Sequence, residues 1–346
     1  MDTGHGTLGE IEALGGTLAR VRTEVGRSIV GQDAVVDQAL TTLLAGGHAL
    51  LVGVPGLGKS RLVETLATVL GLHTKRVQFT PDLMPADILG SEVLDETAQG
   101  RAFRFLPGPV FCQLLMADEI NRASPRTQSA LLQAMAEARV AVAGTDHALP
   151  KPFHVLATEN PIEQEGTYPL PEAQLDRFMF MINVGYPSEQ EEFDIVQRTT
   201  AMHHVELQHV LSGEEILSLQ ETVRSVPVAD HVIRYALQLS RLTRREQAGC
   251  PKFITDYVSW GAGPRASQYL ILAGKARALL KGRHHVSIDD IRSVAMPVLR
   301  HRIVTNFNAE AEGIKSDAIV QKLLDHVPVQ DHEPVDKSVQ STMTTA

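Results

Sequence analysis

The sequence is poor in aromatic residues and carries an excess of negative charge. Aromatic side chains make up 5% of its 346 residues, which disfavours a surface of stacked rings for single-stranded nucleic acid. The net charge of −9 argues against a chain whose main task is to grip a phosphate backbone, although a local basic patch remains compatible with it. Both features disfavour a protein whose main ligand is nucleic acid.

Cysteine is scarce, and long apolar runs are absent. Cys112 and Cys250 lie far apart and form neither a metal-ligand nor a redox spacing, so we expect a reducing compartment. No segment has the ~18 consecutive apolar residues that span a bilayer, and "MDTGHGTLGE" lacks the basic and apolar regions of a signal peptide. The sequence therefore predicts a cytoplasmic protein without a membrane span.

The first half of the chain predicts a doubly wound parallel sheet. Helical patterns at 60–70 and 124–138 alternate with short apolar runs rich in branched residues, which suit parallel strands buried on both faces. Strands that alternate with helices indicate an α/β domain with right-handed crossovers. We expect five strands, at 48–54, 75–79, 112–119, 153–160 and 178–184.

The second half predicts a helical domain that follows a Tyr-Pro-Ser linker at 186–188. Three of its helices begin near a capping residue type, at Ser212, Asp230 and Ser287. The amphipathic segments are 191–202, 212–226, 229–245, 264–282 and 287–303. The expected boundaries are a flexible N-terminus at 1–8, an α/β core at 9–186, a helical domain at 187–327 and a polar, disordered tail at 328–346.

The segment "GVPGLGKS" at 53–60 predicts a phosphate-binding loop. Gly53, Gly58, Lys59 and Ser60 fit the pattern G-x-x-x-x-G-K-[ST], and the segment follows a predicted strand and opens a predicted helix. The glycines let backbone N–H groups turn toward the β-phosphate, Lys59 would reach the β- and γ-phosphates, and the Ser60 hydroxyl would ligate Mg²⁺. The alternative, a glycine-rich turn capped by Ser60, is disfavoured by the full combination. We therefore predict a nucleotide site.

Polar residues at the ends of two further strands indicate that the nucleotide is hydrolysed and not only bound. In "LLMADEIN" (114–121), Asp118 is placed to hold the Mg²⁺ shell and Glu119 to polarise an attacking water. Asn160, at the end of "FHVLATEN", would orient the same water through its amide. The alternatives are that the two acids cap the next helix and that Asn160 forms a turn before Pro161. Their position after a phosphate-binding loop favours the catalytic interpretation.

Two arginines are candidates for stabilising the charge of a phosphoryl-transfer transition state. Arg177 lies in "LPEAQLDRFMF", just before the fifth strand, and Arg265 begins a helix in "GAGPRAS". The alternative for each is a surface arginine paired with a carboxylate, which is the commoner fate of an arginine. The spacing leaves both interpretations open.

Taken in order, these motifs resemble those of AAA+ ATPases, and more closely the MoxR group in the branch with an insert in helix 2. The resemblance runs from about residue 8 to 326. It implies a P-loop NTPase fold, with a doubly wound parallel five-stranded sheet and a C-terminal all-α lid domain. The motifs that carry it are "VGQDAVV" (30–36), "GVPGLGKS" (53–60), "FTPDLMPADILG" (79–90), "FLPGPVF" (105–111), "ADEINRASPRTQSALLQAMAE" (117–137), "ATENP" (157–161), "GTYPLPEAQLDRF" (166–178) and "GAGPRA" (261–266).

The resemblance implies roles for individual residues. Asn160 resembles sensor 1, Arg177 the arginine finger donated to a neighbouring subunit's ATP, and Arg265 the sensor 2 arginine of the lid. Gly263 stands where many relatives have Ser, and whether Arg265 serves its own ATP or a neighbour's stays open. The implied ligands are ATP and Mg²⁺. The residues implied to contact the nucleotide are Val30 and Gly31 at the adenine, and Gly53, Val54, Pro55, Gly56, Leu57, Gly58, Lys59, Ser60 and Leu62; those implied to hold the metal are Ser60 and Asp118.

The resemblance further implies a ring, with a hexamer as the expected form, because a finger acts in a neighbour's site. Two hairpin inserts are expected, at 91–108 with a turn at Gln99 and Gly100, and at 138–153 with a turn at Gly144 to Asp146. In such rings these inserts tend to face the pore or the partner surface.

The expected function is Mg-dependent ATP hydrolysis by a ring of chaperone type that acts in the maturation or assembly of client proteins. A separate partner with a von Willebrand factor A (VWA) domain is implied, because this chain contains no such domain. The alternatives are a nucleic-acid motor of helicase type and a nucleotide-gated scaffold with little turnover. The net charge and the second hairpin tip, "GTDH", argue against the nucleic-acid motor, because the tip lacks Lys and Arg.

Overall fold

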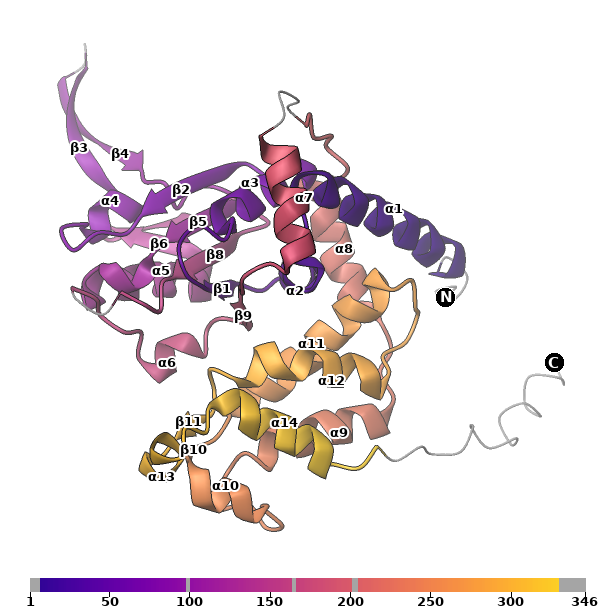
Figure 1. Cartoon of the computed structure of the whole chain (residues 1–346). Helices are drawn as coiled ribbons and strands as arrows, with labels where there is room; N and C mark the ends of the chain where they lie inside the picture. Colours follow the sequence, from indigo (N-terminus) through magenta and orange to yellow (C-terminus); the bar gives the residue numbers. More distant parts are fainter. Residues whose placement is uncertain (1–6, 98–99, 164–165, 201–204, 330–346) are drawn as a thin grey trace, which may run out of the picture.

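A parallel five-stranded sheet organises the N-terminal part of the chain, as predicted. The computed structural model describes residues 7–97, 100–163, 166–200 and 205–329, and the sheet lies at the upper left of Figure 1. The strand order is β2-β5-β8-β1-β9, and neighbouring strands are parallel. The strands are β1 (Ala49–Val52), β2 (Thr74–Gln78), β5 (Leu114–Asp118), β8 (His154–Glu159) and β9 (Phe180–Asn183).

The expectation that all five strands are buried on both faces is wrong for β2. Only Val77 among its five residues is buried, whereas every residue of β5 is buried. The cause is position: β2 lies at the edge of the sheet, where one side has no neighbouring strand. The sequence of β2, Thr-Lys-Arg-Val-Gln, contains a single apolar residue, and this composition suits an edge strand better than a central one.

Helices cover both faces of the sheet. On one face, β1 contributes Leu51 to an apolar cluster with α2 (Asp33–Leu44) and α3 (Lys59–Val69). On the other face, Leu50 packs with α5 (Pro125–Glu137) and the short α4 (Pro85–Leu89). Successive residues of a strand point to opposite faces, so this alternation fixes the sheet between the two layers.

The C-terminal half forms the predicted helical lid. Its buried side chains from α11 (Pro264–Leu280) and α12 (Ile288–Leu299) belong to the same apolar cluster as α2 and α3, so lid and sheet share a continuous core (Figure 1). The other lid elements are α8 (Gly213–Ser225), α9 (Asp230–Arg241), α10 (Lys252–Tyr257), β10 (Val258–Trp260), β11 (Val304–Thr305), α13 (Phe307–Ala311) and α14 (Ser316–His326). Three further helices are α1 (Thr7–Ser28), α6 (Glu172–Leu175) and α7 (Glu189–Thr199).

Two of the three predicted helix caps are confirmed. Ser212 and Ser287 accept hydrogen bonds from the backbone three residues later and form capping boxes. The prediction for Asp230 is wrong, because Ala229 occupies the cap position and Asp230 is the first helical residue. An acidic residue is favoured both as a cap and in the first turn, so its presence does not fix the boundary to one residue.

Both predicted hairpins are present. The first joins β3 (Gly90–Thr97) to β4 (Gly100–Pro107) and projects from the body (Figure 1). Gln99, predicted in its turn, lies outside the described residues, and Gly100 already belongs to β4. The second joins β6 (Arg139–Val142) to β7 (Thr145–Ala148).

The predicted turn of the second hairpin is displaced in the structure. Its turn residues are Ala143 and Gly144, both with positive φ, rather than Gly144 to Asp146. A two-residue turn of this handedness matches the twist of the flanking strands, and Asp146 becomes a strand residue paired with Ala141. The predicted flexible and disordered ends fall mostly on residues 1–6 and 330–346, outside the described residues, and the domain limits stay predictions.

Candidate functional site

The phosphate loop has the backbone that its glycines predict. Gly56 and Gly58 have φ of 84° and 76°, in the left-handed region that favours glycine. Gly58 is the N-cap of α3, which begins at Lys59. The loop therefore leads from β1 directly into a helix N-terminus, where unpaired backbone N–H groups favour an anion.

A cavity of 370 Å³ lies at the carboxyl ends of β1, β5 and β8. These three strands are neighbours in the sheet, so their ends meet at one edge. The cavity brings together the predicted loop residues from Pro55 to Ser60, both acids and the amide, whereas Gly53 and Val54 do not line it. It is lined by Pro55, Gly56, Leu57, Gly58, Lys59, Ser60, Arg61, Asp118, Glu119, Thr158 and Asn160.

Lys59 is held against its own loop. Its ammonium donates hydrogen bonds to the carbonyl oxygens of Gly53 and Val54, the latter at 2.9 Å. Burial lowers the pKa of Lys59, and the negative charges of Asp118 and Glu119 oppose that shift. Lys59 therefore places a positive charge in the cavity that also contains both acids.

Asp118 is buried and is fixed by two partners. The hydroxyl of Thr158 donates to its Oδ1 at 2.6 Å, and the guanidinium of Arg76 on β2 donates to its Oδ2 at 2.6 Å. A hydroxyl and a carboxylate are suitable Mg²⁺ ligands, and both Ser60 and Asp118 line the cavity. The donor set therefore fits the metal that the sequence predicts.

Glu119 is held in a restricted backbone conformation at the mouth of the cavity. Its φ is 55°, uncommon for a residue with a side chain, and its N–H donates to the Thr158 hydroxyl at 2.9 Å. Gln78 on β2 and Arg122 donate to its Oε2 at 2.6 and 3.0 Å. The carboxylate is thus aimed by side chains from two elements, β2 and the turn Ile120–Arg122.

Asn160 supplies a donor to the same space. Its Oδ1 accepts from the N–H of Ile162 at 3.3 Å, which is the predicted turn role. Its Nδ2 is buried and has no hydrogen-bond partner among the described residues. A buried donor without a partner is costly, so the amide is available for a ligand or water in the cavity. The turn role and the catalytic interpretation are compatible here.

Arg177 and Arg265 do not line this cavity. Arg177 is half-buried, and its guanidinium donates to the carbonyl oxygen of Leu132 on α5 at 2.5 Å. Arg265, at the start of α11, forms an ion pair with Asp176 at 2.8 Å. Because Asp176 precedes Arg177 in the chain, the two arginines share one region where lid and core meet.

The segment predicted at the adenine lies beside the loop. Next to Gly31, Gln32 donates through Nε2 to the carbonyl oxygen of Leu57 at 3.1 Å. Gly31 has φ of 66°, and a Cβ there would lie 2.6 Å from the Glu191 carboxyl group on α7. Val30 is half-buried, whereas the side chain of Leu62 is 1% exposed and packs in the core rather than lining the cavity.

Sequence reasoning missed the side chains that hold the acids. Arg76 and Gln78 belong to β2, which was predicted from the sequence only as a strand. Thr158, which lies in the segment "FHVLATEN" and was given no role, contacts both Asp118 and the Glu119 backbone. The sequence does contain a signal for this pair, because Arg76 and Gln78 are two positions apart and residues i and i+2 of a strand share a face.

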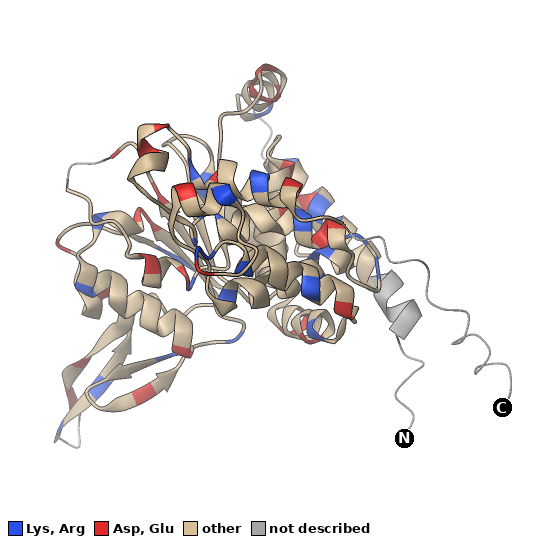
Figure 2. Ribbon diagram, turned by 90° about the horizontal axis from the view of Figure 1, so that it is seen from below, with Lys and Arg blue, Asp and Glu red and all other residues tan. Residues whose placement is uncertain are grey.

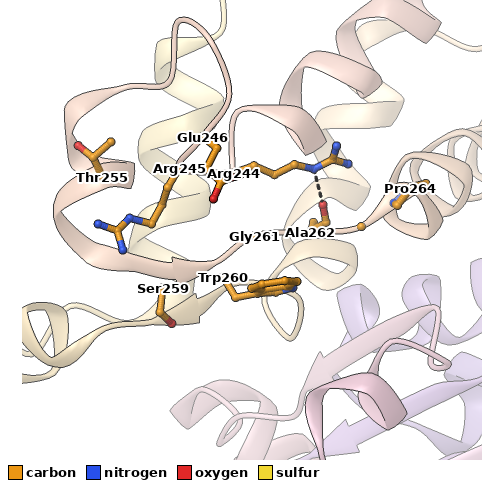
Figure 3. Close-up of a pocket in the computed structure, with 10 residues that line it drawn as sticks. Arg244, Arg245, Glu246, Thr255, Ser259, Trp260, Gly261, Ala262 and Pro264 are labelled. Atoms are coloured by element: carbon orange, nitrogen blue, oxygen red, sulfur yellow. Dashed lines mark hydrogen bonds between the residues drawn. The ribbon is translucent and has the colours of Figure 1, made fainter.

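A larger cavity of 680 Å³ lies on the lid, separate from the phosphate loop (Figure 3). Trp260 lies on the side opposite Arg244 and Arg245, and its side chain is 73% exposed. Arg244 donates to the Ala262 carbonyl oxygen at 2.9 Å. One wall continues through Pro264 into α11, so this cavity adjoins the region of Arg265.

Comparisons with known proteins agree with this geometry. Residues 48–180 match a family model described as the ATPase family associated with various cellular activities (AAA). Residues 253–323 match a model described as an AAA lid domain. The first match contains the phosphate loop, both acids and Arg177, and the second contains Arg265.

Relatives match most of the chain. "Chaperone MoxR1" of Mycobacterium tuberculosis is 44% identical over 312 residues, covering 90% of this chain and 82% of that protein. "Protein MoxR" of Methylorubrum extorquens is 32% identical over 301 residues, covering 82% and 87%. A solved structure from Cytophaga hutchinsonii, described as that of a candidate ATPase, has a TM-score of 0.86 and 38% identity, covering 93% of this chain and 98% of that one.

Proposed function

We propose that this chain, which belongs to the MoxR family of AAA ATPases, works as a ring in which each ATP is hydrolysed between two subunits. The observation that carries the proposal is the separation of the site residues. The phosphate-loop cavity contains Asp118, Glu119 and Asn160. Arg177 and Arg265 lie outside that cavity, near each other. A second subunit is then needed to bring arginines to the γ-phosphate, and a hexamer is the proposed form.

Within one subunit, the residues of the cavity bind ATP and prepare the water. The backbone N–H groups of the loop and the ammonium of Lys59 bind the phosphates. Ser60 and Asp118 would hold Mg²⁺, which would supply positive charge to the phosphate oxygens. Glu119 accepts the proton of the attacking water, and the free Nδ2 of Asn160 donates a hydrogen bond that orients this water.

In this proposal the neighbouring subunit adds positive charge at the γ-phosphate to that of Lys59. Arg177 is the proposed finger, and Arg265 is proposed to act beside it on the same neighbour's ATP. The ion pair of Arg265 with Asp176 supports this, because it fixes Arg265 next to the Arg177 backbone. We therefore propose that Arg265 acts in trans.

We assign the ATP cycle to the remodelling or assembly of other proteins. One relative is a chaperone by its printed name, "Chaperone MoxR1", which supports a client protein as the target. A separate VWA-domain protein is the proposed partner. Cys112 and Cys250 are free thiols, which supports the cytoplasm as the compartment. Among the described helices, none has the length and apolar character that crossing a bilayer requires.

Charge distribution supports a protein target over nucleic acid. Basic and acidic residues are interspersed along the ribbon (Figure 2), and Arg139, at the second hairpin, is paired with Glu137 and Asp146. A pull-down with Glu119→Gln and ATP tests the assignment, with capture of a client protein expected. DNA-stimulated ATPase activity that weakens steeply with salt would favour the motor instead. Rings that assemble but are equally inert in wild type and Glu119→Gln would favour the scaffold.

Lys59→Ala is expected to raise the Kd of ATP at least about tenfold. The substitution removes charge-assisted hydrogen bonds to phosphate, each worth about 1.5–3 kcal/mol, and 1.4 kcal/mol corresponds to tenfold in affinity. Titration with a fluorescent ATP analogue measures the change. Lys252→Ala, on α10 of the lid and outside the cavity, is the matched control. Equal affinity of Lys59→Ala and wild type would contradict the phosphate-binding role of this loop.

Trp260 provides a built-in reporter of ring assembly, because it is the chain's single tryptophan. Its side chain is exposed and lies close to the loop that leads into Arg265. We expect ATP-driven assembly of Glu119→Gln to shift the fluorescence emission to shorter wavelength, since a neighbouring subunit would shield the indole from water. Lys59→Ala with ATP should show no shift. Assembly without any spectral change would contradict the placement of this surface at the subunit contact.

A further inference from the structure

We infer that Arg302, in the lid, is a positioning residue that sets the orientation of the turn that carries Arg177. Arg302 follows α12 and is 5% exposed. Its Nη2 donates to the carbonyl oxygens of Asp176 and Phe178, at 2.8 and 2.7 Å, and its Nη1 donates to that of Met179 at 3.3 Å. These acceptors lie on both sides of Arg177. The guanidinium therefore holds the backbone immediately before and after the proposed finger.

Lid side chains donate hydrogen bonds to every carbonyl group of this turn. The one intervening carbonyl oxygen, that of Arg177, accepts from the hydroxyl of Tyr269 on α11 at 3.4 Å. Four consecutive carbonyl groups, from Asp176 to Met179, thus accept hydrogen bonds from lid side chains. The segment lies between α6 and β9, in neither element. Its backbone N–H groups donate to carbonyl oxygens of the core, those of Asp176 to Phe178 within α6 and that of Met179 to His48, whereas the lid holds its carbonyl groups.

Asp176 couples the two arginines of the lid. Its Oδ1 accepts from Nε of Arg302 at 2.7 Å, and its Oδ2 accepts from Arg265 at 2.8 Å. The carboxylate occupies the position before Arg177, so one side chain ties α11, the end of α12 and the finger turn together. A rotation of the lid would move this turn and hence the direction of Arg177.

Arg302 is itself fixed within the lid. Its Nη1 also donates to the Val298 carbonyl oxygen at 2.5 Å, and its guanidinium carbon lies 5.1 Å from the centre of the Tyr269 ring. Burying a charged group costs free energy that an apolar residue of similar size would not. What the planar guanidinium adds is several donors in a fixed geometry. Three of the carbonyl groups that accept from Arg302 belong to the turn around Arg177, which is the reason to assign Arg302 a role beyond packing.

The inference rests on the proposed function, in which Arg177 acts on a neighbour's ATP, and the test separates the two. The starting mixture combines Arg177→Ala subunits, which keep an ATP site, with Lys59→Ala subunits, which keep a finger. Active sites form only where the first type receives Arg177 from the second. Arg302→Lys is then added either to the finger donor or to the subunit that holds ATP. Lysine keeps the charge but not the planar fork.

We expect Arg302→Lys to lower the recovered ATPase activity about 10- to 100-fold when it is in the finger donor, because a displacement of about 1 Å can cost that much. The same substitution in the ATP-holding subunit should leave the recovered activity within about twofold. Equal loss in both arrangements would identify a general structural role and overturn the inference, as would no loss in either. No recovery in the starting mixture would instead overturn the trans role of Arg177, and the inference with it.

Two further variants serve as a matched control and as a substitute if Arg302→Lys does not fold. Arg300→Lys is the matched control, because Arg300 lies in the same segment but pairs with Asp317 and contacts Met181 rather than the turn. It should leave the recovered activity unchanged in both arrangements. If Arg302→Lys does not fold, Asp176→Asn takes its place, since it keeps the side-chain shape and removes both ion pairs at the turn. The same donor-specific loss is expected, and a loss without that asymmetry would overturn the inference.

Discussion

Glu119→Gln is expected to lower the kcat of ATP hydrolysis about 100- to 10,000-fold while the Kd of ATP stays within about twofold of wild type. A positioned general base contributes a rate factor of this size, and glutamine cannot accept the proton. The amide keeps the shape of the side chain and an oxygen that Gln78 and Arg122 can still donate to. Steady-state ATPase assays and nucleotide titration separate the two quantities.

The control for this change is Glu64→Gln. Glu64 is exposed on α3, the helix that begins in the phosphate loop, and it does not line the cavity. Its replacement removes the same charge from a nearby element and should change kcat less than about twofold. If Glu119→Gln retained most of its activity, the assignment of Glu119 as the base would be wrong, and another group in the cavity would have to accept the proton.

Arg177→Ala is expected to lower kcat about 1,000- to 100,000-fold, the range over which an arginine stabilises the charge of phosphoryl transfer. Binding of ATP by the same subunit should be retained, because Arg177 contacts Leu132 rather than the phosphate cavity. Activity should return in part when Arg177→Ala is mixed with Lys59→Ala, although each variant alone is inactive. ATPase assays over a range of mixing ratios measure this recovery.

The matched control for Arg177 is Arg139→Ala. Arg139 lies on β6 and pairs with Glu137 and Asp146 on the surface, so its loss should have little effect on kcat. A peak of activity at intermediate ratios of Arg177→Ala and Lys59→Ala is the signature of a site made by two subunits. Inactivity at every ratio, with both variants assembled, would count against a finger that acts in trans.

The phosphate loop, the two acids and Asn160 are the part of the site that was predictable from the sequence. Their roles depend on short-range rules: glycines in a loop before a helix, and acids or an amide at the carboxyl ends of strands. The strand order places β5, β8 and β1 side by side, so Asp118, Asn160 and Lys59 meet without any information beyond the topology.

The groups that hold these residues were not predictable, because they come from distant positions. Arg76 reaches Asp118 across a β-strand pair, and Arg302 reaches Asp176 from 126 positions away in the chain. An arginine in a sequence has many possible carboxylate and carbonyl partners, and only the packing of lid on core selects among them. The prediction that Asp230 caps a helix was wrong for a local reason, because an acidic residue is favoured both at the cap and in the first turn.

The central claim is that ATP is hydrolysed at a site completed by a second subunit, and specific activity as a function of protein concentration tests it most directly. Wild-type ATPase activity per subunit, measured at saturating ATP together with the sedimentation coefficient, should rise with protein concentration and follow the fraction of assembled chains. Activity per subunit that stays constant down to concentrations at which the protein is monomeric would contradict the claim.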